Sequence, residues 1–164
     1  MDVSDLPRVG LTEAVERLAS MPSFVEAALE AASGEELVFR PGEGELSLTE
    51  QACHLRDLDR EGYLVRVRRI LAEETPSLAS FDGATIARER DYLSQNARAA
   101  AQDFAQARRS LTALLAPLTP AQLKREAIFE GRRITLEGLV AMILEHDRGH
   151  REEIESIVDA VSAD

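Results

Sequence analysis

The sequence is poor in the residues that stack on nucleic-acid bases and in those that form disulfides. Among its 164 residues there is no tryptophan, aromatic residues make up 4%, and the only cysteine is Cys53. So few aromatic side chains give no sign of a platform on which bases stack. A single cysteine cannot form a disulfide within the chain, which fits a reducing compartment.

Positive charge and long apolar runs are also scarce. Acidic residues outnumber basic ones by 30 to 19, so the formal net charge is -11. This balance opposes binding to nucleic acid, which requires clustered cations, and to anionic membranes. There is no apolar run of about 18 residues, and residues 1–5 lack the basic start of a signal peptide. We therefore expect a cytoplasmic protein with no nucleic-acid and no membrane partner.

The sequence does contain enough apolar residues for a core. Hydrophobic residues make up 45% and charged residues 30%, a balance typical of globular proteins. The length suits one compact domain over residues 1–164. Glycine and proline separate segments in which apolar residues recur at three- and four-residue steps, the spacing of amphipathic helices. The prediction is an all-α fold.

Four long helical segments are predicted from this spacing. The second begins at a capping box, Ser47-Leu48-Thr49-Glu50. The first is expected to be interrupted at Met21-Pro22, because proline removes a hydrogen-bond donor and clashes with the preceding turn. The predicted bounds are 12–33, 47–73, 85–116 and 135–161. The buried stripe of the second segment is predicted at Leu48, Leu55, Leu58, Gly62 and Val65.

Shorter elements are predicted in the connections. Pro22 is expected to open a short helix of its own, and Thr119-Pro120-Ala121-Gln122 resembles another capping box. Ile128 and Phe129 are candidates to pair as strands with Arg133 and Ile134. Because amphipathic segments cannot bury their stripes alone, we predict a four-helix bundle with short extra helices in the connections.

Two of the three histidines lie four residues apart in the last predicted helix. His146 and His150 therefore share one helix face, where both imidazoles can approach one ion. They interrupt the apolar stripe between Ile143 and Ile154, so they should face inward. Neutral imidazole is a common ligand of zinc, nickel, copper and iron, and a metal would satisfy ring nitrogens that a core leaves without partners.

The remaining histidine, His54, lies on the flank of the apolar stripe of the second segment. It could reach the same interior space as His146 and His150, so we predict that these three residues share one metal site. The alternative is that they are surface or core polar groups, since the four-residue spacing also arises by chance.

Several neighbouring residues have an open role. Asp57 and Glu61 lie one and two turns beyond His54, and Asn96 lies beside the seam of the third segment. They could support an imidazole or act as a base, but solvated carboxylates and a core-edge amide are the simpler interpretation. Cys53 is expected to be a packed side chain, with a reactive or coordinating thiol as the alternative.

Charged residues beyond these are expected on the surface. Asp147 and Glu152 flank the histidine pair and should face solvent or neighbouring arginines. The arginines of 66–69 and 88–90 should lie on helix surfaces balanced by acidic residues. Their alternative role is binding an anionic cofactor such as a sugar-thiol.

Taken together, these features resemble the DinB-like superfamily of four-helix-bundle proteins. The similarity covers nearly the whole chain and is specific through the order of its segments. These segments are Met21-Pro22, Arg40-Pro41-Gly42, Glu45 to Glu50, His54-Leu55-Arg56-Asp57, Gly131 to Leu136, and His146-Asp147-Arg148-Gly149-His150. The resemblance implies an up-down-down-up bundle, often a homodimer, whose metal is held by one histidine of the second long helix and two of the last. Matched residue by residue, those are His54, His146 and His150.

The resemblance leaves the reaction open. Relatives include transferases that join bacillithiol or mycothiol to small electrophiles, a mycothiol-dependent isomerase and the iron-binding domain of ergothioneine synthases. The ergothioneine synthases carry a second catalytic domain that we do not expect here, so their full reaction is not expected either. Three neutral ligands leave coordination positions open, as in catalytic sites, where a thiol or water can be activated. We expect a divalent zinc, nickel or iron ion and a small-molecule substrate. The leading hypothesis is a transferase using a low-molecular-weight thiol; the alternatives are a metal-dependent hydrolase, a non-catalytic metal-binding stress-response protein, and a helical dimer without a metal.

Overall fold

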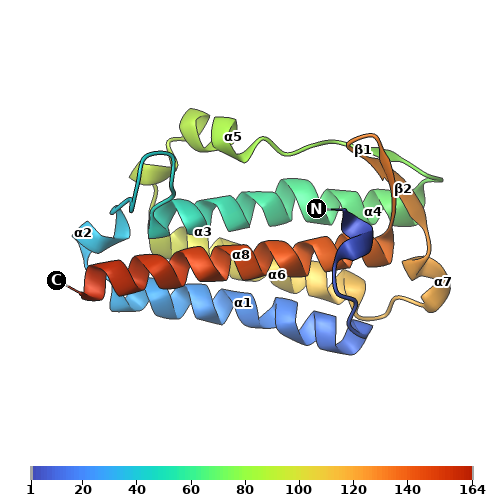
Figure 1. Ribbon diagram of the computed structural model, residues 1–164, viewed down its shortest axis with the longest axis horizontal. Coiled ribbons are helices and arrows are strands. Elements are labelled where there is room, and N and C mark those ends of the chain that lie inside the picture. Colours follow the sequence, from blue (N-terminus) through green and yellow to red (C-terminus); the bar gives the residue numbers. More distant parts are fainter. Residues whose placement is uncertain (1, 164) are drawn as a thin grey trace.

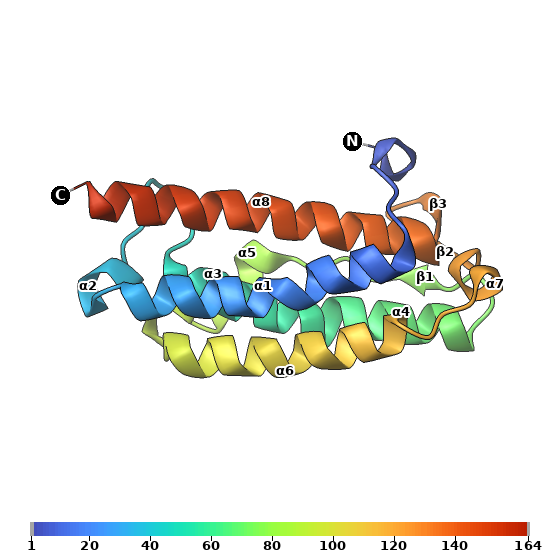
Figure 2. The same cartoon turned by 90° about the horizontal axis from the view of Figure 1, so that it is seen from below.

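Four long rods of helix run side by side along the molecule (Figures 1 and 2). The computed structural model describes residues 2–163. The rods are α1 (Leu11–Ala31), α3 and α4 (Leu48–Asp57 and Leu64–Ala72) joined by a π-helix (Leu58–Tyr63), α6 (Ala97–Leu115) and α8 (Leu136–Ser162). Figure 1 shows that α1 and α8 run in one direction and α3–α4 and α6 in the other. The prediction of an all-α, up-down-down-up four-helix bundle is confirmed.

Short helices lie in the connections, as predicted: α2 (Gly34–Leu37), α5 (Gly83–Glu89), η3 (Tyr92–Ser94) and α7 (Pro120–Leu123). Only α7 stands where the sequence predicted a short helix, since the one expected at Pro22 is part of α1. A further short helix, η1 (Val3–Asp5), precedes α1. The capping boxes at Ser47 and Thr119 both form, with Glu50 and Gln122 as their partners. Each box satisfies backbone amides that the first turn of a helix leaves free, which is why α3 and α7 begin where the sequence predicts.

A small sheet closes one end of the bundle. Its strands are β1 (Ser77–Leu78), β2 (Glu126–Phe129) and β3 (Arg132–Thr135), in the order β1-β2-β3. The predicted pairing is confirmed, since β2 runs antiparallel to β3 with Ile128 opposite Arg133. Strand β1 pairs with β2 in parallel and was not predicted.

Helix α1 continues through Pro22, so the predicted interruption is wrong. Proline has no N–H to donate to the carbonyl four residues earlier, which here is that of Leu18. That carbonyl accepts a hydrogen bond from Arg108 Nη1 at 3.0 Å instead. A side chain of another helix thus supplies the donor that the proline lacks.

The third long helix begins at Ala97, not near residue 85 as predicted. Residues 83–89 form the separate helix α5, which ends before Asp91, a residue in the left-handed region with φ 46°. The side chain of Asn96 then caps α6 by accepting from the amide of Ala99. Asn96 is exposed, so it is not the core-edge amide that the sequence predicted.

The π-helix changes which residues of the second rod face the core. An i→i+5 turn contains an extra residue, so the inward face advances along the sequence. Val65, predicted in the buried stripe, is 42% exposed, while Leu64, Val67 and Ile70 are buried. Asp59, within the π-helix, points into the bundle and is 1% exposed.

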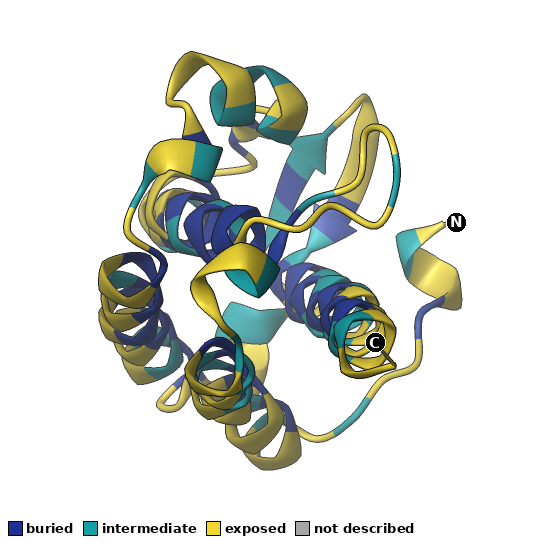
Figure 3. Ribbon diagram, turned by 90° about the vertical axis from the view of Figure 1, so that its left-hand side faces the viewer, coloured by how far each residue is buried: buried dark blue, intermediate teal, exposed yellow. Residues whose placement is uncertain are grey.

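Buried apolar residues form two clusters, one in each half of the bundle, and buried faces point inward on all four rods (Figure 3). Between them lies a buried polar group that we call the Arg108 cluster: Arg108, Asp59, Asp147 and the Leu18 carbonyl. Arg108 donates to Asp59 at 2.8 and 3.1 Å and to Asp147 at 2.6 and 3.0 Å. Each rod supplies one member.

None of the helices within residues 2–163 has the length and apolar character needed to cross a membrane.

Replacing Arg108 with methionine should lower the free energy of unfolding by about 3–5 kcal/mol, because it leaves two buried carboxylates without a counter-charge. Urea unfolding followed by circular dichroism measures this. Arg109→Met is the matched control, since Arg109 is exposed on the same helix. Equal unfolding midpoints for the two variants would show that the cluster contributes little to stability.

Candidate metal centre

The three histidines come from two rods that lie against each other. His54 is on α3, and His146 and His150 are on α8. The Ser47 capping box fixes the start of α3, and the side chain of Thr135 caps α8 by accepting from the Gly138 amide. Because the helix starts are fixed by local sequence, the positions of the histidines along their rods are fixed as well.

The side chains of His54, His146 and His150 converge inside the bundle. Their ligand atoms lie within 4.8 Å of one another. Nε2 of His146 is 3.0 Å from Nε2 of His150 and 3.4 Å from Nε2 of His54. Two nitrogens bound to one tetrahedral zinc ion are about 3.3 Å apart, so these separations fit a shared ion. The structure therefore brings the predicted residues together; that they bind a metal stays a prediction.

Burial keeps two of these imidazoles neutral. Burial, followed by the proximity of His150, lowers the pKa of His54 to about 4. Burial and the two other histidines lower the pKa of His146 to about 2. Neutral imidazole is the form that binds metals, so both side chains are ready to do so at neutral pH.

Hydrogen bonds to Nδ1 differ between the two histidines of α8. Nδ1 of His150 lies 2.6 Å from Oε1 of Gln51 and 3.3 Å from Oε2 of Glu153. Gln51 in turn donates to Glu153 at 2.6 Å. The hydrogen bond with His150 is the main reason that the pKa of Glu153 falls to about 2. Nδ1 of His146 is buried and has no hydrogen-bond partner among the described residues.

A cavity of about 650 Å³ opens beside His54 and His150. Its apolar wall includes Leu46, Ala87 and Ile157, and its charged lining residues within the described chain are all acidic: Glu45, Glu152 and Glu153. Gly83 at the start of α5 also lines it. A Cβ atom at Gly83 would lie 3.0 Å from Cε1 and 3.1 Å from Nδ1 of His54, so glycine lets α5 approach that ring closely.

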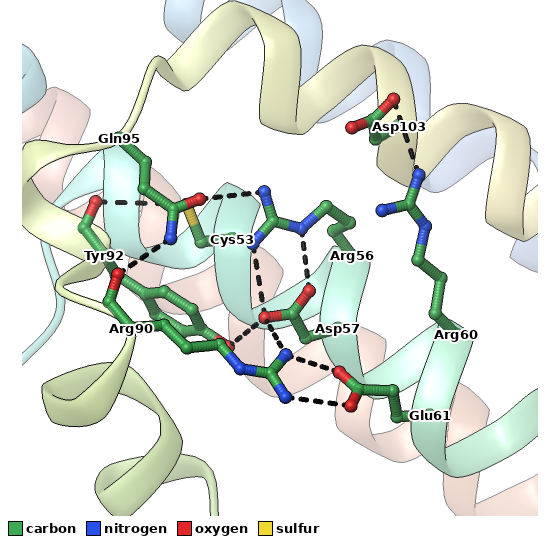
Figure 4. A network of polar contacts seen from close by, with 9 residues as sticks. All are labelled: Cys53, Arg56, Asp57, Arg60, Glu61, Arg90, Tyr92, Gln95 and Asp103. Carbon is green, nitrogen blue, oxygen red and sulfur yellow. Dashed lines mark hydrogen bonds and ion pairs between the residues drawn. The ribbon is translucent and has the colours of Figure 1, made fainter.

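Asp57 and Glu61 lie outside this site. Figure 4 shows Asp57 accepting from Arg56, Arg90 and Tyr92, and Glu61 accepting from Arg90. Asp57 is buried, so the expectation of a solvated carboxylate is wrong for it. Burial alone would raise the pKa of Asp57, but its hydrogen bonds outweigh burial and lower it. Asp57 therefore stays ionised within an ion-pair network.

Cys53 is a packed side chain, as predicted. It is fully buried, and its Sγ lies 3.9 Å from the carbonyl oxygen of Tyr92 and 3.6 Å from Oε1 of Gln95 (Figure 4). Burial is the main cause that raises the pKa of the thiol to about 11. The thiolate, which is the nucleophilic form, is therefore scarce at neutral pH.

Two expectations for surface charges need correction. Asp147 is buried rather than at the surface, and the arginine that it faces, Arg108, belongs to another helix. Arg66 is buried too, with its guanidinium 4.6 Å from the ring centre of Phe129. Arg90 is paired with Asp57 and Glu61. None of the described arginines lines the cavity.

Sequence reasoning missed Gln51, Glu153 and Gly83. The first two were detectable, because Gln51 precedes His54 by three residues and Glu153 follows His150 by three, a spacing that places side chains on one helix face. Gly83 had no local signal, since its proximity to His54 arises only when the loop after α4 folds back.

The fold and the site define a helical bundle with a three-histidine cluster open to a cavity. The sequence matches the model of the DinB superfamily over residues 17–154. The chain belongs to the DinB superfamily.

Among solved structures, the chain is similar to YfiT from Bacillus subtilis, described as a probable metal-dependent hydrolase with an unusual four-helix bundle topology. The TM-score is 0.86 and the sequence identity 22%, over 95% of this chain and 93% of YfiT. At this identity the likeness shows the fold alone. No curated protein matches the sequence significantly.

The native protein should react slowly with 5,5′-dithiobis(2-nitrobenzoic acid) at neutral pH, because Cys53 is buried and its pKa is raised. Absorbance of the released thiolate measures the rate, and the same protein unfolded in urea is the control. Rapid release from the folded protein would identify Cys53 as a reactive thiol.

Proposed function

We propose that this protein is a metal-dependent enzyme that uses His54, His146 and His150 as ligands for a divalent ion, zinc, nickel or iron, and acts on a small molecule in the adjoining cavity. The observation that carries the proposal is the convergence of three imidazole nitrogens beside a cavity of about 650 Å³. This volume lies within the range of about 300–1,000 Å³ that small-molecule sites occupy.

The donor set fits a catalytic ion better than a structural one. Structural zinc sites usually have four protein ligands, whereas catalytic sites have three and keep a position open. Within the described residues, these histidines are the only group of three or more His, Cys, Asp or Glu side chains placed to share an ion. When bound, the ion would supply a Lewis acid that activates a water or thiol. His54 and His150 would hold it at the cavity wall, where a substrate can reach it.

Hydrolysis is the reaction that the cavity supports best. The charged lining residues are acidic, and none of the arginines considered as a site for an anionic sugar-thiol lines the cavity. An anionic thiol would therefore meet like charge, which weakens binding, while a neutral or cationic substrate would not. The description of YfiT as a probable metal-dependent hydrolase supports the same choice. Transfer of a low-molecular-weight thiol, as in relatives of the family, is the second candidate.

Protein purified without added metal should contain close to one equivalent of a divalent ion, and His146→Ala should contain almost none, because two imidazoles hold an ion more weakly than three. Elemental analysis of both samples measures this. Arg148→Ala is the control, since Arg148 is exposed two residues away on α8. Equal, near-zero metal in all three proteins would reject the proposed site.

The metal-loaded protein should hydrolyse a small ester with a trimethylammonium acyl group faster than the matched ester with a carboxylate, because the lining carboxylates repel an anion. Release of nitrophenol measures both rates, and chelator-treated protein is the control. Incubation with bacillithiol, mycothiol or glutathione and a chlorinated electrophile tests the second candidate. A metal-dependent thiol adduct without ester hydrolysis would favour the transferase.

A further inference from the structure

We infer that Gln51, held in place by Glu153, is a positioning residue that fixes which ring nitrogen of His150 faces the other histidines. The inference rests on the proposed function, because Nε2 of His150, the nitrogen that faces the other histidines, is the one that would bind the ion. Gln51 is 1% exposed, although glutamine is mostly found on protein surfaces. A buried amide needs partners for both its oxygen and its nitrogen, and Gln51 has one for each.

The direction of the amide follows from its partners. A carboxylate only accepts hydrogen bonds, so the Gln51 atom 2.6 Å from Oε2 of Glu153 must be the donor Nε2. Oε1 of Gln51 then faces Nδ1 of His150 at 2.6 Å. An amide oxygen only accepts, so Nδ1 of His150 must carry the hydrogen. In the neutral ring, Nε2 then carries no hydrogen, and its lone pair faces Nε2 of His146, 3.0 Å away.

Gln51 is better placed for this role than Glu153. Oε2 of Glu153 also lies near Nδ1 of His150, but at 3.3 Å, and the Glu153 side chain is 56% exposed. Water competes for an exposed carboxylate and screens its charge. The shorter contact from the buried amide is the one that water does not reach, so Glu153 acts mainly by orienting Gln51.

One turn of α3 thereby serves two histidines on different helices. His54 and Gln51 are three residues apart on α3, so the turn that carries one ligand also supports His150 on α8. His146, the other histidine of α8, has no such support at its Nδ1 among residues 2–163. Hydrogen bonds from outside the ligand shell commonly set the tautomer and orientation of a ligating histidine, and their loss costs about 10- to 100-fold in metal affinity.

The tautomer of His150 can be read in the metal-free protein by long-range ¹H–¹⁵N NMR at about pH 8, where imidazoles are mostly neutral. His150→Gln assigns the signals. In the wild type, Nδ1 should be protonated and Nε2 not. In Gln51→Leu, which has a similar volume but no acceptor, His150 should become a mixture of tautomers. Retention of the wild-type pattern in this variant would overturn the inference.

Exchanging the two partners provides the rescue. In Gln51→Glu/Glu153→Gln, a carboxylate accepts from His150 and the new amide donates to that carboxylate, so the wild-type tautomer should return. Zinc affinity by competition with a chelating dye should fall about 10- to 100-fold in Gln51→Leu and recover in the double variant. Loss of the tautomer in the double variant, with an unchanged thermal melting curve, would show that Gln51 only packs.

The two proposals fail in different ways. If the wild type binds no divalent metal, the proposed function is rejected, yet the NMR spectra still decide whether Gln51 sets the tautomer. If the wild type binds metal with the same affinity as Gln51→Leu, the metal site stands and the role of Gln51 is rejected.

Discussion

A buried guanidinium at mid-length of the bundle fixes how the four rods sit against one another. Arg108 on α6 is 1% exposed and bonds to Leu18 on α1, Asp59 in the π-helix and Asp147 on α8. A buried charge is costly unless it is paired and hydrogen-bonded. Sliding any rod by one turn would therefore leave buried charged groups without partners. Because Asp147 directly follows His146, this constraint also sets the position of His146 and His150 along the bundle.

Two irregularities of the backbone supply what Arg108 needs. Pro22 removes the amide that would otherwise bond to the Leu18 carbonyl, and that carbonyl becomes free to accept from Arg108. The π-helix turns Asp59 toward the core, where a regular helix would have continued a stripe through Val65. Each irregularity would weaken an isolated helix, and each is compensated by the same side chain of another rod. Each irregularity is a property of one helix, but the hydrogen bonds that compensate it come from tertiary packing.

The candidate site combines buried imidazoles with an adjoining open cavity. Burial keeps His54 and His146 neutral, so they do not repel one another as cations would, and their nitrogens remain available to an ion. A cavity whose charged lining residues are acidic opens beside His54 and His150. Glu153 belongs to both parts of the site, since it lines the cavity and also accepts a hydrogen bond from Gln51, the partner of His150. The buried histidines, the buried amide of Gln51 and the cavity-lining Glu153 thus come from one turn of α3 and two turns of α8.

Local sequence was sufficient for the elements whose cause is local. Capping boxes at Ser47 and Thr119 set helix starts, and the four-residue spacing of His146 and His150 put both on one face. It was insufficient where a distant partner outweighs a local preference. Pro22 led to the prediction of a helix break, but Arg108 supplies the donor that the proline lacks and α1 continues. Asp147 was predicted at the surface, but it is buried against Arg108 of α6. Gly83 approaches His54 only because a loop folds back over α3. Spacing along the chain encodes helices and faces, whereas the neutralisation of a buried charge and the close approach of two backbones are properties of the packed molecule.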